Sequence, residues 1–122
     1  MPKSFSPARL RRIDDIKYLY VRAGDHDFIP IWVVVVKNRV LARSWNDRSR
    51  GWFRAFMAER RGAIRVGAKE VPVRATRVRG ARVLDAMDAA YAAKYTTKAN
   101  LKYVKGFATA KRRANTLELR PI

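Results

Sequence analysis

The sequence of 122 residues contains no cysteine and only one histidine, His26. The missing cysteine excludes disulfides, thiolate metal sites and thiol catalysis. His26 lies between two aspartates, but no serine or second metal ligand stands near it, so we interpret it as an exposed loop residue. The composition therefore offers no catalytic side chain that we can assign and no metal site.

Long apolar runs are also missing. No stretch of about 18 apolar residues is present, which argues against a membrane span. The start of the chain, from Met1 to Phe5, lacks the apolar core of a signal peptide. We therefore expect a cytoplasmic protein. Hydrophobic residues still make up 48% of the sequence, which is enough for the core of one domain over residues 1–122.

Acidic residues are scarce: 10 Asp and Glu stand against 28 Lys and Arg, a formal net charge of +18. Such a surface attracts polyanions, including nucleic acids, acidic membrane faces and phosphorylated cofactors. Residues 94–113 contain basic but no acidic residues, with Tyr103 and Phe107 among them. These aromatic rings can stack on bases or attach the segment, which we predict to be a basic loop, to the rest of the protein.

The chain is organised around residues 29–57. Residues 29–36 are apolar and mostly β-branched, which predicts a strand covered on both faces. The following Lys37-Asn38-Arg39 predicts a tight turn, at which Asn38 tolerates a positive φ. Residues 40–43 then form the returning strand of a hairpin.

A polar loop and a helix follow this hairpin. The aromatic spacing of residues 52–57 predicts a helix from about Ser49 to Arg60. Its first N–H groups lack partners and carry partial positive charge, and Arg43, Arg48 and Arg50 lie close by in the sequence. This arrangement predicts an anion site suited to phosphate. The alternative is an ordinary capped helix that binds only water.

The rest of the chain alternates short strands and helices. The other predicted elements are helices over residues 6–15 and 83–95 and strands over residues 17–22, 63–66, 71–78 and 116–120. Pro72 indicates that its strand starts at a sheet edge. Six short strands with few helices predict an α+β protein built on a small antiparallel barrel.

Several blocks of the sequence occur in the order typical of a bacterial family, domain-of-unknown-function family 2255. The blocks are Ile31–Val34, Arg43–Trp45, Trp52–Ala55, Ile64–Gly67 and Asp88–Tyr95. The resemblance covers about residues 10–120. Members resemble the FMN-binding split-barrel superfamily, which includes pyridoxamine-phosphate oxidase-like and deazaflavin-dependent reductase-like proteins. This resemblance implies a six-stranded antiparallel split β-barrel with three flanking helices, and a homodimer that holds its cofactor in the dimer cleft.

In the deazaflavin-dependent relatives, a strand end, a small-residue turn and a helix opened by tryptophan hold the cofactor phosphate. The corresponding cofactor-binding residues here would be Arg43, Ser44, Trp45, Asn46, Arg48, Trp52 and Arg54. The arginines would neutralise the phosphate, and a tryptophan would stack on the ring system. The cofactor, FMN or a deazaflavin, would carry the hydride chemistry of an oxidoreductase.

Two alternatives stay open. A split barrel without a cofactor would act as a binding or interaction protein, with its cleft holding an apolar ligand or forming a dimer contact. A basic nucleic-acid-binding module would instead use the net charge and the segment over residues 94–113, and its affinity would fall steeply with salt.

Overall fold

The structure, a computed structural model, describes residues 4–122, so the first three residues of the stretch considered for a signal peptide lie outside the described part. The helices are α1 (Pro7–Asp15), α2 (Trp52–Ala58), α3 (Ala81–Lys94), α4 (Lys98–Phe107) and α5 (Ala110–Arg113). The strands are β1 (Leu19–Ala23), β2 (Ile29–Ile31), β3 (Val34–Val36), β4 (Arg39–Arg43), β5 (Arg61–Val66), β6 (Lys69–Arg77) and β7 (Thr116–Pro121).

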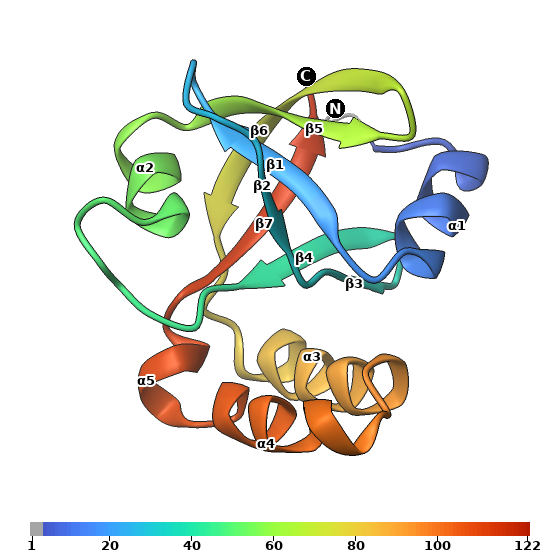
Figure 1. The fold of residues 1–122 in the computed structure, drawn as a ribbon, viewed down its shortest axis with the longest axis vertical. Coiled ribbons are helices and arrows are strands. Elements are labelled where there is room, and N and C mark those ends of the chain that lie inside the picture. The colour runs from blue at the N-terminus through green and yellow to red at the C-terminus, as the bar shows by residue number, and fades with distance from the viewer. Residues whose placement is uncertain (1–3) are drawn as a thin grey trace.

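The strands form one curled antiparallel sheet in the order β2-β1-β5-β6-β7-β4-β3. Figure 1 shows α3, α4 and α5 together as a layer below this sheet, with α1 and α2 on opposite sides of it. The predicted α+β split-barrel fold is therefore confirmed. Within residues 4–122 the sheet has seven strands and is accompanied by five helices, in place of the six and three expected.

The seventh strand arises because the apolar run over residues 29–36 is not one strand. Its first half, β2, pairs with β1, and its second half, β3, pairs with β4. These halves are the two edge strands of the sheet, so Trp32 and Val33 join opposite edges and complete the barrel. The Tyr95 hydroxyl accepts from Val33 N (3.0 Å), and Lys94 Nζ donates to Val33 O (2.8 Å). These bonds replace the ladder bonds that the break removes.

The predicted hairpin turn is confirmed. Val36 pairs with Arg39, which leaves Lys37 and Asn38 as a two-residue loop. Both residues have positive φ, 49° and 65°, as two-residue turns that match the strand twist require.

The strand that contains Pro72 lies inside the sheet, between β5 and β7. Its ladder with β7 begins only at Val73, whereas its ladder with β5 already begins at Lys69. The start of β6 therefore has one free edge, and Pro72 is tolerated there because a proline cannot donate to a ladder.

Two apolar clusters form the core. One fills the barrel and includes Phe53 and Phe56 of α2, which are 3% and 0% exposed. The other lies between the sheet and the helical layer, where Met87, Tyr91 and Tyr95 pack against β3 and β4. The helix predicted from the aromatic spacing of residues 52–57 is thus confirmed, although α2 begins at Trp52 instead of Ser49.

The basic loop predicted over residues 94–113 is wrong, because most of this segment forms α4 and α5. Asn100, Val104 and Phe107 recur at i, i+4 and i+7 and turn one face of α4 inward. The charge of the segment hid this periodicity. None of the helices in the described chain is long and apolar enough to cross a membrane.

Candidate functional site

A cleft of about 440 Å³ opens between the curled sheet and the helical layer. Its lining residues are Tyr18, Pro30, Ile31, Trp32, Arg43, Trp45, Trp52, Asn100, Tyr103 and Phe107. Six of these ten side chains are aromatic, so the cleft offers flat apolar walls with few polar groups. This is the composition of a pocket for a planar organic ring.

Trp32 is half-buried at the break between β2 and β3, and the break turns its ring toward the helical layer. The indole stacks on Tyr95, with centroids 4.0 Å apart and planes 8° apart. It also meets Tyr103 and Phe107 edge-on, at 6.2 and 5.8 Å. Sequence reasoning missed Trp32 because it treated the residue as part of a continuous strand. The one signal was a lone aromatic residue inside a valine run.

Trp45 forms a wall of the cleft and does not fill it, because 37% of the residue is exposed. It meets Tyr103 and Phe107 edge-on at 5.4 and 5.6 Å. The Arg112 guanidinium lies 3.5 Å above the indole, and Arg112 Nε donates to Trp45 O at 2.8 Å. Gly106 makes room for this ring, since a Cβ at that position would collide with it.

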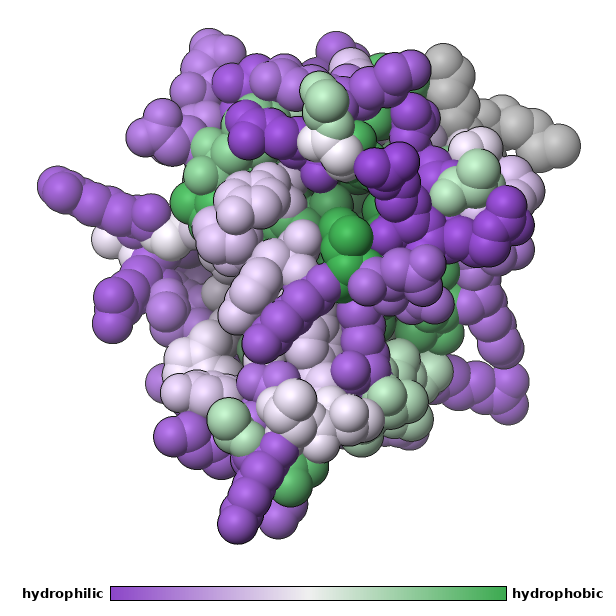
Figure 2. Space-filling view, turned by 45° about the vertical axis from the view of Figure 1, so that its right-hand side comes forward, coloured by the Kyte–Doolittle hydropathy of each residue, from purple (hydrophilic) through white to green (hydrophobic). Residues whose placement is uncertain are grey.

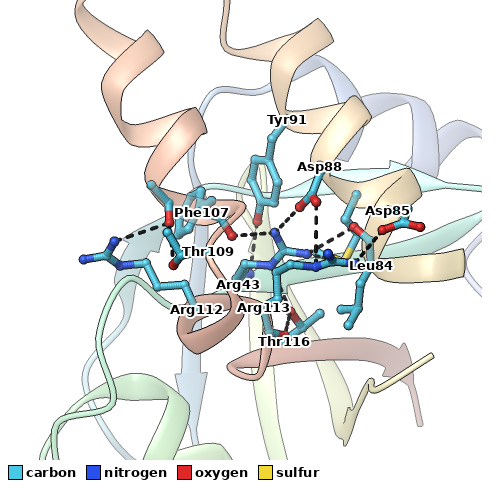
Figure 3. A network of polar contacts seen from close by, with 12 residues as sticks. Arg43, Leu84, Asp85, Asp88, Tyr91, Phe107, Thr109, Arg112, Arg113 and Thr116 are labelled. Atoms are coloured by element: carbon cyan, nitrogen blue, oxygen red, sulfur yellow. Dashed lines mark hydrogen bonds and ion pairs between the residues drawn. The ribbon is translucent and has the colours of Figure 1, made fainter. Parts of the chain in front are cut away.

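Arg43 ends β4 and has a fully buried side chain. Its guanidinium donates to Asp88 Oδ1 (2.5 Å), to Phe107 O (2.8 Å), to Thr116 Oγ1 (3.0 Å) and, more weakly, to Leu84 O (3.4 Å). Figure 3 shows this side chain reaching from the sheet into the helical layer, surrounded by these groups. Each of its three nitrogens is thus bonded to the protein. The fifth N–H points to Met87 Sδ at 4.0 Å, so every N–H of the guanidinium faces a protein acceptor and the side chain joins β4, β7, α3 and α4.

Two tyrosines of the helical layer support the same region. The Tyr91 hydroxyl accepts from Arg43 N at 3.0 Å, and burial raises the pKa of this phenol far above its usual range. Burial also raises the pKa of Tyr95 to about 12. Both phenols therefore stay protonated at neutral pH and serve as hydrogen-bonding groups. Burial lowers the pKa of Lys94, although Asp14 and Asp15 oppose the shift.

The polar side chains of Ser44 and Asn46, in the loop after β4, bond within the loop. Ser44 is buried, and its hydroxyl donates to Asn46 O at 2.5 Å. Asn46 Oδ1 in turn accepts from Arg48 N at 3.2 Å. The side-chain oxygens of these two residues thus already have protein partners.

The three predicted phosphate-binding arginines contact different parts of the protein. Arg43 is buried under the helices, whereas Arg54 forms a two-point ion pair with Asp47 at 2.6 and 2.8 Å. Arg48 is exposed, and within residues 4–122 it has no ion pair. Of the predicted set, the structure brings Arg43, Trp45 and Trp52 to the cleft lining.

Asn100 supplies a polar group that sequence reasoning did not find. It is 9% exposed and lies in the cleft lining on α4. Its backbone N–H bonds to Thr97 O, and no hydrogen bond joins its side-chain amide to another of the described residues. A carboxamide presents a donor beside an acceptor, which matches a ring edge that carries an N–H next to a carbonyl.

The described residues offer no site for a metal ion, since no three His, Asp or Glu side chains among them are grouped to share one. The exposed loop that contains His26 is outside the cleft lining. The arrangement as a whole can hold a flat, partly polar ring and supplies no nucleophile against it.

Comparison with known proteins identifies a family and a shared fold. The sequence profile of DUF2255, described as an uncharacterised protein conserved in bacteria, matches residues 9–119. No curated protein matches the sequence.

Several solved structures share this fold, two of which follow. A conserved hypothetical protein from Mycobacterium tuberculosis has a TM-score of 0.59 at 11% identity, and the match covers 99% of this chain and 82% of that one. An FAD-binding protein from Mesorhizobium loti has a TM-score of 0.52 at 13% identity, covering 99% and 91% of the two chains. At such identities the likeness establishes the fold alone.

Proposed function

Because this chain belongs to DUF2255, a bacterial family of uncharacterised proteins, we propose its function from its geometry: it binds a flavin-class cofactor in the aromatic cleft and acts as an oxidoreductase. The observation that carries the proposal is the cleft, in which six aromatic side chains surround one amide without a protein partner. The shared fold with a protein named as FAD-binding supports it.

The cleft suits the ring of such a cofactor. Its volume of about 440 Å³ lies within the range typical of small-molecule sites. Trp32 is already stacked on Tyr95 and offers an aromatic floor of fixed orientation. Trp45 and Trp52 would bound the ring, and Asn100 would bond the N–H and carbonyl of its pyrimidine edge.

The bound cofactor, FMN, FAD or a deazaflavin, would supply the hydride or electron transfer. The residues of this chain would orient the ring and exclude water from it. For the cofactor phosphate we assign Arg48, because Arg54 is neutralised by Asp47 and Arg43 is bonded inside the protein. A guanidinium can bind a phosphate with two parallel hydrogen bonds.

We also propose that the site is completed in a homodimer, as the split-barrel resemblance implies. The cleft rim exposes Tyr18, Trp45 and Tyr103 at 45%, 37% and 42%. A second copy covering this rim would shield the ring from water. Light scattering coupled to size-exclusion chromatography would give the mass, and a monomer that binds flavin fully would contradict the shared site.

The test is a titration of the protein with FMN, FAD and a deazaflavin, followed by flavin fluorescence and absorbance. We expect saturable quenching by the indoles with at least one of them. Asn100→Ala should weaken binding about tenfold, which corresponds to the roughly 1.4 kcal/mol of a lost hydrogen bond. Tyr20→Ala is the matched control, because Tyr20 is exposed and outside the cleft lining. No uptake of any of the three at millimolar concentration would overturn the proposal in favour of a barrel without cofactor.

A further inference from the structure

The helical layer carries an uncompensated positive surface. No acidic residue occurs between Asp88 and Glu118. Within this interval Lys98, Lys102 and Lys105 recur at i, i+4 and i+7 on α4, so they share one stripe, and all three are exposed. Figure 2 shows long hydrophilic side chains projecting at the lower end of the molecule, where this layer lies.

The lysine stripe differs from the other basic regions of the protein by its regular spacing on one helix face beside exposed aromatic rings. Some arginines elsewhere are paired with carboxylates, as in Arg22–Glu70, Arg39–Glu118 and Arg54–Asp47. In the part of the chain that the structure describes, the three lysines of the stripe have no ion pair. Like charges at these spacings destabilise a helix. A polyanion laid along α4 would remove this repulsion.

Exposed aromatic rings continue the stripe toward the cleft. Lys102 Nζ lies 5.1 Å from the centroid of the Tyr103 ring. Tyr103 meets Trp45 at 5.4 Å, and the Arg112 guanidinium lies 3.5 Å above Trp45. The two rings are 42% and 37% exposed. We name this surface the α4 ledge and define it by Lys98, Lys102, Tyr103, Lys105, Trp45 and Arg112.

We propose that the α4 ledge binds single-stranded nucleic acid, with phosphates along the lysine stripe and a base against the Tyr103–Trp45 pair. A cationic track beside exposed aromatic rings is what sequence-tolerant single-strand binding needs, because every base has a face that can stack. A duplex keeps its bases paired and would use only the charges. The inference goes beyond the proposed flavin site. Tyr103 and Trp45 belong to both sites, so an oligonucleotide competes for these rings with the flavin and with a second copy on the rim, whereas no lysine of the stripe lines the cleft.

The experiment measures anisotropy of labelled oligonucleotides of about 12 residues, a length within the usual single-strand site sizes. Oligo(dT), oligo(U) and a duplex of equal length are compared in a salt series. We expect both single strands to bind more tightly than the duplex. Their affinity should fall with salt with a slope of about −0.7 for each phosphate engaged. Duplex binding as tight as single-strand binding would overturn the proposal.

Charge variants test the stripe. The triple variant K98Q/K102Q/K105Q should lose at least tenfold in affinity at low salt, and its salt slope should shrink by about 2 because three contacts are removed. The matched control R60Q/K69Q/R74Q removes the same charge from exposed residues without ion pairs within the described chain. Equal losses in both triples would show only diffuse attraction and would overturn the assignment to α4.

An aromatic variant tests the stacking. Tyr103→Ala should weaken single-strand binding about fivefold or more and leave duplex binding unchanged. Tyr20→Ala is the control, because Tyr20 is 43% exposed and lies on β1. Circular dichroism verifies that each variant is folded. Flavin titration of the lysine triple separates the two proposals: unchanged flavin uptake with lost oligonucleotide binding assigns the lysine stripe to the oligonucleotide and not to the flavin. If Tyr103→Ala leaves single-strand affinity unchanged, a base does not stack on Tyr103 and the single-strand assignment is overturned.

Discussion

Arg43 is the residue on which the junction between sheet and helices depends most. Its side chain is fully buried and bonded to α3, α4 and β7 at once. A buried guanidinium is costly unless every N–H finds a partner, and here the partners come from elements far apart in the sequence. The hydrogen bonds of Arg43 therefore join the barrel to the helical layer.

We predict that Arg43→Ala lowers the free energy of unfolding by about 3–5 kcal/mol, the range for breaking a buried ion pair. The Asp88 carboxylate would lose its 2.5 Å partner and keep only Arg113 at 3.7 Å. Arg43→Lys should recover little, because an ammonium lacks the planar fork. Urea unfolding followed by circular dichroism gives the values.

Arg48→Ala is the matched control, since Arg48 is exposed in the same loop region. It should change the free energy of unfolding by no more than about 0.5 kcal/mol. Similar losses for both arginines would contradict the role given to Arg43.

At the scale of elements, α4 connects the cleft to the outer surface. Its inward face contributes Asn100 and Phe107 to the cleft lining, and its outward face carries the lysine stripe. At Gly106 the Trp45 ring packs directly against α4. The close contact places the loop after β4 against α4 and thereby sets one wall of the cleft.

Gly106→Ala tests this contact. An alanine normally stabilises a helix interior by about 1 kcal/mol over glycine. Here the added methyl group meets the indole, so we expect a loss of about 1–3 kcal/mol, as in overpacked sites. Tryptophan emission should shift as Trp45 moves.

The double variant G106A/W45A provides the internal control. Removing the ring removes the collision, so the alanine should then be neutral or stabilising relative to Trp45→Ala alone. If the double variant loses as much stability as the two single variants together, the Trp45 ring and Gly106 act independently, which would contradict the contact.

At the scale of the whole molecule, the barrel depends on the short link between β2 and β3. The link joins the two sheet edges, and α3 holds it through the Tyr95 hydroxyl, which accepts from Val33 N and donates to Lys17 O at 2.6 Å. The ring that carries this hydroxyl stacks on Trp32, which lines the cleft. Closure of the barrel and construction of the cleft thus rely on one phenol.

This phenol predicts a dependence of stability on alkaline pH. Burial raises the pKa of Tyr95 to about 12 from 10.0, so the folded state keeps a proton that the unfolded chain releases above about pH 10. Its contribution to stability is therefore constant below pH 10 and falls as the pH rises toward 12. Burial of Lys94 has the opposite effect on stability. Its pKa is lower in the folded state than in the unfolded chain, so its contribution to the free energy of unfolding grows as the pH rises toward the pKa of the unfolded chain.

Urea unfolding of the wild type and of Tyr95→Phe at a series of pH values between 8 and 11.5 isolates the Tyr95 contribution. The wild type should be more stable by about 1–3 kcal/mol at pH 8, where Val33 N has its partner. The difference should shrink above pH 10. A difference that stays constant across the series would contradict the predicted ionisation.

The sequence alone was sufficient where a property depends on neighbours along the chain. The left-handed turn at Lys37 and Asn38 follows from local backbone preference, and the buried face of α3 follows from residue spacing. The net charge of +18 and the lack of cysteine likewise required no coordinates. Of the proposed site, Trp45 and Trp52 were assigned through the resemblance to the deazaflavin-dependent relatives, and both lie in the cleft lining.

Only the tertiary structure decided the break in the valine run, the burial of Arg43 and the place of Asn100 in the cleft. A strand of uniform apolar character does not show where it changes partners, because that point is set by hydrogen bonds from α3, more than sixty residues away. An arginine beside a polar loop looks exposed until α3, α4 and β7 together supply acceptors for its three nitrogens. Local preference acts over a few residues, whereas burial and bonding are settled by contacts between distant segments.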